Sequence, residues 1–256
     1  SIKAELNKYR AEGRTIGFVP TMGFLHAGHL SLVEESNKQC DLTVVSIYVN
    51  PSQFNEKKDF TSYPKNTKLD LELLESVGCD IVWIPEVEEI TSIPLTVNYD
   101  VKDTDKELEG KQREGHFKGV IEVVFRLFKA IDPDFSFFGE KDYQQFKVIE
   151  AMSKNNNFKA KVVPVPTKRE MDGLAMSSRN VRLALPERKL APELHAVLQR
   201  LSSGESSDLE LAKKSLVEKG FVVEYLCQFE FFEGRKRLFA AVQLGGVRLI
   251  DNVTLD

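Results

Sequence analysis

Two histidines near the N-terminus have a spacing suited to phosphate binding. They occur in the run PTMGFLHAGH, where His26 and His29 are three residues apart and share one face of a helix that starts there. Imidazole N–H groups at a helix N-terminus can donate to phosphate oxygens, aided by the positive end of the helix dipole. Gly23 and Gly28 allow the main chain to approach a ligand closely. The alternatives are a glycine turn with two surface histidines and a zinc site, for which the HExxH spacing and an evident third ligand are missing.

A second group of donors lies in the run Met176-Ser177-Ser178-Arg179-Asn180. Each serine supplies a hydroxyl donor, and the guanidinium of Arg179 supplies a planar fork that suits phosphate oxygens. Taken alone, this run also fits an ordinary polar loop before a helix. Because it follows an apolar run at 161–165, as the histidine motif follows one at 15–19, the two together favour phosphate binding more strongly than either alone.

Two further runs carry polar side chains directly after apolar segments. In Phe138-Gly139-Glu140-Lys141-Asp142, Lys141 offers a mobile ammonium to a polyphosphate, while Asp142 either caps the next helix or contacts a ribose. One helical turn later, Gln145 is expected to face the same side. In Val49-Asn50-Pro51-Ser52-Gln53-Phe54, Gln53 offers an amide to a hydroxyl or carboxylate, and the alternative is an ordinary Asn-Pro turn. Together these loops predict a crevice for ATP and a small polar acid.

Strands and helices alternate over the first two thirds of the chain and must position these loops. Short apolar or β-branched runs predict buried parallel strands at 15–19, 42–49, 81–84, 135–138 and 161–165. Helical patterns lie between them at 30–39, 69–77, 120–131 and 142–155, and Asn66 and Gly78 are candidate cap residues. The alternation predicts an α/β fold with a Rossmann-like doubly wound parallel sheet, whose ligands bind at the carboxyl ends of the strands.

The pattern changes after about residue 166, which predicts two domains. Residues 1–166 form the ligand-binding domain, and residues 167–256 form a second, smaller α+β C-terminal domain. One helix is predicted from Pro186 to about Leu201, and another, capped by Asp208, is predicted to end at Gly220. Strands are predicted at 221–229, 238–244 and 247–255, the last two joined by Gly245-Gly246, a dipeptide suited to a tight hairpin turn.

The composition limits the possible partners. The net charge of −4 and pI of about 5.7 argue against nucleic acid as the main ligand. The three cysteines, Cys40, Cys79 and Cys227, form no CxxC pair, which disfavours a disulfide framework and a zinc knuckle. No apolar stretch approaches the roughly 18 residues of a membrane span, so we expect no membrane association and a reduced, cytoplasmic location.

The ordered motifs resemble those of a known enzyme family. The histidine run resembles the HxGH signature of the nucleotidyltransferase superfamily, and the run at 176–180 lies where its members carry a KMSKS-type phosphate loop. The set PTMGFLHAGH, VNPSQF, EGKQREGHFKGV, FGEKDYQQ and DGLAMSSRN resembles the pantothenate synthetase (pantoate–β-alanine ligase) family specifically. These matches span residues 16–183, and RLIDN at 248–252 resembles the family's C-terminus.

The resemblance implies an ATP-dependent ligase that condenses pantoate with β-alanine through a pantoyl adenylate and releases AMP and pyrophosphate. It implies Mg²⁺ bridging the phosphates of ATP, with no metal-ligating residue assigned in the chain. It also implies a homodimer whose C-terminal domain acts as a mobile lid.

The residues implied by the resemblance fall into three groups. The catalytic donors are His26, His29, Lys141 and Arg179, and His29 matches the residue usually assigned as the catalytic donor. Gln53 and Gln145 would hold pantoate, with Gln53 also near β-alanine. The implied ATP contacts are Met22, Gly23, Phe24, Leu25, His26, Ala27, Gly28, His29, Gly139, Glu140, Lys141, Asp142, Lys168 (through its main chain), Met176, Ser177, Ser178 and Arg179.

Three positions depart from the usual pattern of the family. Glu114 replaces a proline, which is expected to loosen a loop bordering the site. Glu122 replaces a threonine beside Val123 and Val124, which match positions of the pantoate pocket. Because an inward carboxylate would repel pantoate, Glu122 is expected to point outward. Tyr48 replaces a phenylalanine, and its hydroxyl would need a partner.

Two other functions are compatible with phosphate-binding loops. An adenylyltransferase acting on a phosphorylated cofactor precursor would release a stable adenylylated product and would not depend on an amine. A non-catalytic ATP sensor would be stabilised by ATP without releasing AMP, and the intact donor set argues against it.

Overall fold

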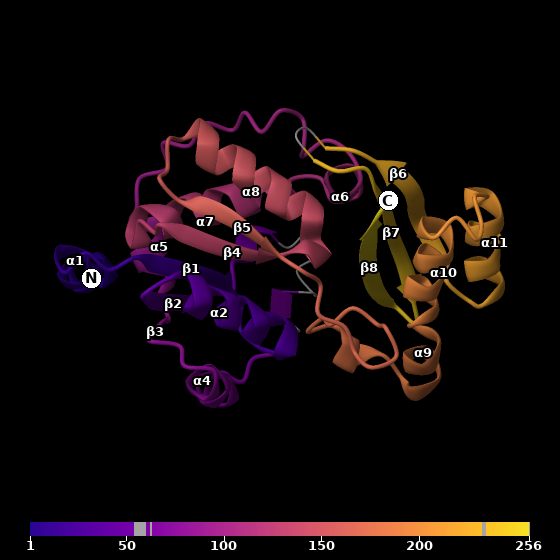
Figure 1. Cartoon of the computed structure of the whole chain (residues 1–256), viewed down its shortest axis with the longest axis horizontal. Helices are drawn as coiled ribbons and strands as arrows, with labels where there is room; N and C mark the ends of the chain where they lie inside the picture. Colours follow the sequence, from indigo (N-terminus) through magenta and orange to yellow (C-terminus); the bar gives the residue numbers. More distant parts are fainter. Residues whose placement is uncertain (54–59, 62, 232–233, 256) are drawn as a thin grey trace. The chain divides into compact units, whose positions relative to one another are not determined.

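The chain folds into two compact units (Figure 1). The computed structural model describes residues 1–53, 60–61, 63–231 and 234–255. Phe54, the last residue of the VNPSQF motif, lies outside the described residues. One unit comprises Ser1–Glu140 with Gln144–Val165, and the other comprises Lys141–Tyr143 with Pro166–Asp256. Residues 141–143 therefore group with the C-terminal unit, although their chain neighbours on both sides belong to the N-terminal unit.

A five-stranded parallel sheet forms the centre of the N-terminal unit. Its strands are β1 (Ile16–Thr21), β2 (Leu42–Ile47), β3 (Ile81–Trp83), β4 (Phe135–Gly139) and β5 (Lys161–Val165), in the order β3-β2-β1-β4-β5. Since β1 pairs with both β2 and β4, the direction in which the sheet grows reverses between β1 and β4. This switch point is where a doubly wound sheet binds ligands. The predicted fold class and all five predicted strands are confirmed.

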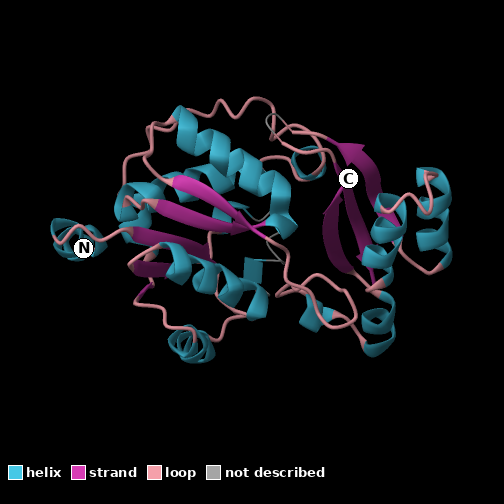
Figure 2. Cartoon of the chain, in the orientation of Figure 1, coloured by secondary structure: helices cyan, strands magenta, loops and turns pink. Residues whose placement is uncertain are grey.

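Helices follow these strands along the chain (Figure 2). In the described part of the chain up to Val165 they are α1 (Ile2–Ala11), α2 (Ala27–Gln39), α4 (Thr67–Ser76), α5 (Val87–Thr91), α6 (Glu109–Gln112), α7 (His116–Ile131) and α8 (Tyr143–Asn155), with the 3₁₀ turns η1 (Pro51–Gln53) and η2 (Glu140–Asp142). The sequence patterns did not predict α5 and α6, because they are too short to show a helical period, nor α1, which buries only Leu6. No helix in the described residues is long and apolar enough to cross a membrane.

Buried apolar side chains join the helices to the sheet. Helix α2 packs across β1, β2, β4 and β5, and its Leu32 and Val33 join Val19, Val45 and Phe137 in one core cluster. The predicted caps of α4 are confirmed: the Asn66 side chain accepts from the N–H of Leu69 (3.2 Å), and Gly78 follows the helix at φ 72°.

The C-terminal unit contains a three-stranded antiparallel sheet with helices packed on it. Its strands, β6 (Val222–Phe229), β7 (Arg237–Leu244) and β8 (Val247–Thr254), lie in the order β6-β7-β8. Gly245 and Gly246 join β7 to β8 with φ angles of 56° and 76°, as a tight turn of this kind requires. Asp208 caps α11 (Leu209–Glu218) by accepting from the N–H groups of Glu210 and Leu211, both at 2.9 Å. The predicted hairpin turn and cap are therefore confirmed.

The helix predicted from Pro186 to Leu201 is wrong as a single element. The structure has two helices there, α9 (Leu185–Leu190) and α10 (Glu193–Ser202), after the 3₁₀ turn η3 (Asn180–Arg182). Pro192 lies between them as the N-cap residue of α10. Because proline has no N–H group and its ring clashes with the preceding helical turn, the helix ends before Pro192 and a new one starts after it.

Candidate active site

The chain turns sharply at the carboxyl end of β1, where the histidine motif begins. Thr21 closes the strand: its hydroxyl donates to the carbonyl of Ser46 (2.7 Å) and accepts from the N–H of Gly23 (3.2 Å). Gly23 and Phe24 then have φ angles of 77° and 52°. A residue with a side chain adopts this left-handed conformation only when its surroundings hold it there, so Phe24 needs a fixed partner.

Asp70, in the first turn of α4, provides that partner. Its carboxylate accepts from the N–H groups of Phe24 (2.9 Å) and Leu25 (2.7 Å), and its side chain is buried. Asp70 was not among the residues predicted from the sequence. The available signal was its place four residues before the buried Leu74, on the helix face where an apolar residue is expected.

His26 and His29 fix each other's orientation at the start of α2. His26 is the N-cap residue, and its ring Nδ1 accepts from the main-chain N–H of Gly28 (3.1 Å). The main-chain N–H of His26 donates to the ring Nδ1 of His29 (3.3 Å). The two imidazole rings pack against each other in a tilted arrangement, with centroids 4.1 Å apart. Because Nδ1 accepts a hydrogen bond in both rings, each neutral imidazole carries its proton on Nε2 and acts there as a donor.

The loop after β2 is held around Gln53. The amide group of Asn50 donates to Oε1 of Gln53 (3.3 Å) and to the carbonyl of Gly119 (3.1 Å). Nε2 of Gln53 lies 2.8 Å from the sulfur of Met22, which is only a weak acceptor. The structure therefore brings together Met22 and Gln53, two of the predicted ligand contacts, and turns the NH₂ group of Gln53 toward the histidine motif.

His116, at the start of α7, supports the same loop. Its Nδ1 lies 2.9 Å from the carbonyl oxygen of Gln53, and its Nε2 lies 3.1 Å from Nη1 of Arg113. Since a guanidinium can only donate, Nε2 is the acceptor and Nδ1–H donates to Gln53. Helix α7 comes this close because residue 119 is glycine: a Cβ there would lie 2.4 Å from the carbonyl oxygen of Ser52. This supporting role of His116 was not predicted from the sequence.

Two neighbouring glutamines on α8 have different environments. Gln144 is buried and donates to the carbonyls of Thr104 (2.8 Å) and Glu107 (2.7 Å), while it accepts from the N–H of Glu109 (2.9 Å). It therefore holds the segment that leads into α6. Gln145 is half-buried, and its contact with pantoate stays a prediction.

The three positions that depart from the family pattern have different environments. Glu122 accepts from the hydroxyl of Tyr99 (2.7 Å), a residue that is 41% exposed, so its carboxylate points outward as predicted. Partial burial of that hydroxyl, together with the hydrogen bond to Glu122, raises the pKa of Tyr99 to about 12. Tyr48 is buried, which raises its pKa, and its hydroxyl has no hydrogen-bond partner in the described part of the chain. Glu114 is exposed, just before α7.

In the C-terminal unit, the run at 176–180 follows a short hairpin. The carbonyl of Lys168 accepts from the N–H of Met176 (3.0 Å), which closes the hairpin. Beyond it, the hydroxyl of Ser177 accepts from the N–H of Arg179 (3.3 Å), and Ser178 is buried. The structure therefore places these five predicted nucleotide contacts on one continuous, hydrogen-bonded segment.

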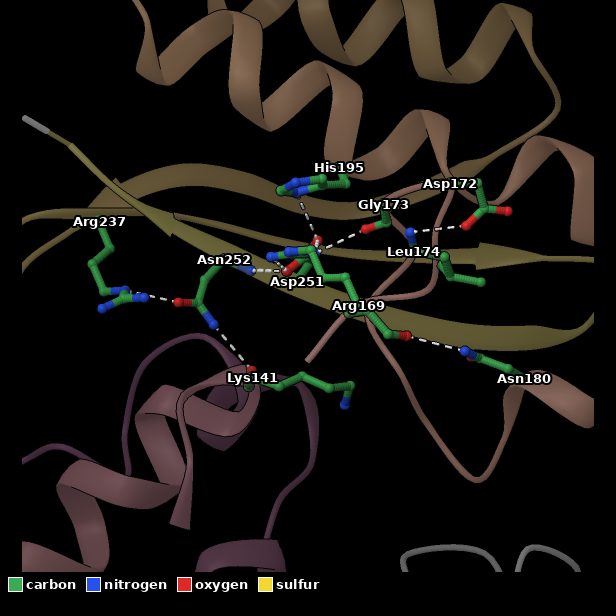
Figure 3. A network of polar contacts seen from close by, with 11 residues as sticks. Lys141, Arg169, Asp172, Gly173, Leu174, Asn180, His195, Arg237, Asp251 and Asn252 are labelled. Carbon is green, nitrogen blue, oxygen red and sulfur yellow. Dashed lines mark hydrogen bonds and ion pairs between the residues drawn. The ribbon is translucent and has the colours of Figure 1, made fainter. Parts of the chain in front are cut away.

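An ion pair between Arg169 and the buried carboxylate of Asp251 anchors this hairpin to β8 (Figure 3). Asp251 accepts two hydrogen bonds from Arg169, at 2.7 and 2.9 Å, and its carboxylate lies 3.4 Å from Nδ1 of His195. Arg169 also donates to the carbonyl of Gly173 (3.2 Å) in the turn of the hairpin. Burial alone would raise the pKa of Asp251, but the nearby ring of His195 and the hydrogen bonds and charge of Arg169 outweigh it and lower the pKa.

The last predicted donor, Lys141, lies in η2 directly after β4. Its Nζ is 3.6 Å from the carboxylate of Asp142, and its side chain is 19% exposed, whereas that of Asp142 is 46% exposed.

The described residues offer neither a reactive thiol at Cys40 or Cys79 nor a cluster of metal ligands. Burial raises the pKa of Cys40 and Cys79 to about 11, so neither thiol is a nucleophile near neutral pH. Among the described residues, no group of three or more His, Cys, Asp or Glu side chains could hold a metal ion.

Comparison with known proteins agrees with this fold. The family model for pantoate-beta-alanine ligase matches residues 1–254. The chain is 44% identical to a pantothenate synthetase of Acinetobacter baumannii, over 98% of this chain and 94% of that protein. It superposes on the crystal structure of the pantothenate synthetase of Thermus thermophilus with a TM-score of 0.84 and 38% identity, covering 94% and 93% of the two chains.

A further solved structure is the pantoate-beta-alanine ligase of Francisella tularensis, complexed with "Beta-gamma ATP" and β-alanine. The TM-score is 0.88 and the identity 33%, over 99% of this chain and 95% of that one. These matches show that the chain is an α/β ligase. It belongs to the pantoate–β-alanine ligase family, since both the family model and the relatives cover nearly its whole length.

We predict that Asp70→Ala destabilises the fold and slows turnover together. It leaves the buried N–H groups of Phe24 and Leu25 without an acceptor, at a cost of about 1–3 kcal/mol each. Urea unfolding should show this loss, and steady-state assays should show slower turnover because the histidine turn loses its partner. Asp80→Ala is the matched control. The Asp80 carboxylate accepts from the N–H of Thr43 (2.8 Å) at the amino end of β2, whereas the histidine turn lies at the carboxyl ends of the strands. Equal turnover in the two variants would contradict a role for Asp70 in holding the site.

Proposed function

We propose that the chain condenses pantoate with β-alanine in an ATP-dependent reaction that passes through a pantoyl adenylate. The observation that supports this best is the histidine turn at the switch point of the sheet. It presents two Nε2–H donors at a helix N-terminus, where phosphate oxygens bind favourably. ATP and β-alanine are named in the complex of the Francisella relative, and pantoate in the name of the family.

In the proposed reaction, the pantoate carboxylate attacks the α-phosphorus of ATP and pyrophosphate leaves. The amine of β-alanine then attacks the acyl carbon, the acyl C–O bond breaks so that AMP leaves, and the nitrogen releases a proton to water as the amide forms. Negative charge grows on phosphate oxygens in the first step, so the enzyme needs fixed donors and positive charge more than a base. We assign His26, His29, Lys141 and Arg179 to this role.

The remaining ligand contacts are proposals as well. ATP would contact the turn from Met22 to His29, the segment from Gly139 to Asp142, the main chain of Lys168 and the run from Met176 to Arg179. Pantoate would be held by Gln53 and Gln145. The support for Gln53 is its amide orientation: Asn50 holds its oxygen, and its NH₂ group, beside a weak acceptor, suits a carboxylate or hydroxyl of the substrate.

Magnesium is proposed to enter with ATP. Mg²⁺ keeps several waters and is usually bound through substrate phosphates with one or two carboxylates. The residues at Lys141 fit this chemistry, since the half-exposed carboxylate of Asp142 lies beside the ammonium. The metal would neutralise charge on the phosphates, with Asp142 suited to accept from one of its waters. A homodimer, a cytoplasmic location and a lid function of the C-terminal domain stay predictions.

We predict that His29→Ala and Lys141→Ala each slow turnover by roughly 10²–10³-fold, because each removes one donor to developing charge. The measurement is AMP release with ATP, Mg²⁺, pantoate and β-alanine. Ser31→Ala is the control on the same helix, since it removes only a hydrogen bond to the carbonyl of Gly28 (2.9 Å). A folded variant that turned over as fast as this control would remove that residue from the proposed mechanism.

Gln53→Ala should weaken pantoate binding by roughly ten- to a hundredfold and leave ATP binding nearly unchanged. The reason is the loss of one hydrogen bond to a charged partner, worth about 1.5–3 kcal/mol. Calorimetric titration with each ligand measures the two affinities. Ser52→Ala, which removes a neighbouring bond to Asn50 (2.9 Å), should change neither. Weakened ATP binding with normal pantoate binding would mean that the two subsites are assigned the wrong way round.

The adenylate step has its own test. With ATP, Mg²⁺ and pantoate alone, the enzyme should exchange labelled pyrophosphate into ATP without β-alanine. In the full reaction, one ¹⁸O from the carboxylate of labelled pantoate should appear in AMP, because the acyl C–O bond breaks when the amine attacks. Label in pyrophosphate, or in neither product, would refute the adenylate. A stable adenylylated product without amine dependence would favour an adenylyltransferase, and ATP binding without AMP release would favour a sensor.

A further inference from the structure

One side chain of β8 holds the main chain at Lys141. The amide group of Asn252 donates to the carbonyl of Lys141 (3.0 Å), and Asn252 is buried (Figure 3). Lys141 is the middle residue of η2, a 3₁₀ turn of three residues. So short a turn has few hydrogen bonds of its own and poor hydrogen-bond geometry. A contact from outside the turn therefore has a large influence on the direction of the peptide group, and with it the direction of the Lys141 side chain.

The orientation of the Asn252 amide is fixed by Arg237 on β7. Nε of Arg237 donates to Oδ1 of Asn252 (2.7 Å). A guanidinium has no acceptor, so the amide oxygen must face Arg237 and the NH₂ group must face Lys141. Arg237 is itself buried, with its guanidinium 4.3 Å from the centre of the Tyr143 ring. The contacts of Asn252 and Arg237 thus reach both ends of the segment from Lys141 to Tyr143.

The preceding residue fixes β8 from its other face. Successive strand residues point to opposite faces, so Asp251 and Asn252 face different partners. Asp251 binds Arg169 through two hydrogen bonds and accepts from the main-chain N–H of Asn252 (2.8 Å). Asp251 therefore anchors the hairpin that leads into the 176–180 run, and the next residue of the strand, Asn252, holds the main chain at Lys141.

We propose that Asn252 is a positioning residue: its hydrogen bond to the Lys141 carbonyl sets where the Lys141 ammonium lies for the phosphates of ATP. This rests on the proposed function, in which that ammonium stabilises charge in the adenylation step. Asn252 acts only through Lys141 and touches no reacting atom. A misplaced catalytic group reduces the rate of chemistry more than the binding of a substrate held elsewhere.

The sharpest variant is Asn252→Asp. It keeps the shape and an oxygen acceptor for Arg237, but its other oxygen cannot donate and faces the Lys141 carbonyl. We expect kcat to fall roughly ten- to a hundredfold, with the KM for pantoate unchanged. In a Lys141→Ala background, the same substitution should cause no further slowing, because residues that act as a unit are not additive.

Ser202→Ala is the matched control. It removes a side-chain hydrogen bond to the Thr254 carbonyl (2.7 Å) on the same strand and touches neither Lys141 nor Arg169. Thermal unfolding identifies the folded variants, and Asn252→Ala replaces Asn252→Asp in the cycle if the aspartate variant is unfolded. Unchanged kcat, or equal slowing with and without the Lys141 side chain, overturns the positioning role. Failure of the unsubstituted enzyme to release AMP with all substrates refutes the proposed function instead.

Discussion

The arrangement of the candidate site depends on one constraint: main-chain groups that leave the end of a parallel strand must find hydrogen-bond partners outside the sheet. At β1 that partner is the carboxylate of Asp70. Burying a carboxylate is unfavourable unless it is hydrogen-bonded, and buried N–H groups are unfavourable without an acceptor. Each side therefore stabilises the other, and a charged acceptor makes these bonds stronger than neutral ones. The left-handed conformation of Phe24, and with it the start of α2, depends on α4.

The same constraint is met in the same way after two other parallel strands. After β2, His116 donates to the carbonyl of Gln53, and after β4, Asn252 donates to that of Lys141. In each case a buried side chain from a segment distant in sequence binds the main chain at or beside a segment with a proposed role. Such a contact places a functional residue without using its side chain, which is how a site on loops becomes preorganised.

Local features could be predicted from the sequence, and partners across the chain could not. The strands, the Asn66 and Asp208 caps and the Gly245-Gly246 turn were predictable, because periodicity and turn chemistry are properties of neighbouring residues. The break at Pro192 was overlooked, although proline gives a local signal there. Asp70 and Asn252 were missed as supporting residues for another reason: each is defined by a main-chain group far away in sequence, such as the 111 residues from Asn252 to Lys141.

The hydrogen bonds of the histidine turn also limit what His29 can do. A neutral imidazole that already accepts at Nδ1 can take up a proton only at that nitrogen, because Nε2 carries the other one. Protonation there would break its bond with the N–H of His26 and leave that donor without its partner. Transfer of a proton to His29 would thus disturb the turn that positions it, whereas donation from Nε2 leaves the turn intact. The geometry therefore favours a fixed hydrogen-bond donor over a general base, in keeping with the first step of the proposed reaction, whose nucleophile is a carboxylate that has no proton to lose.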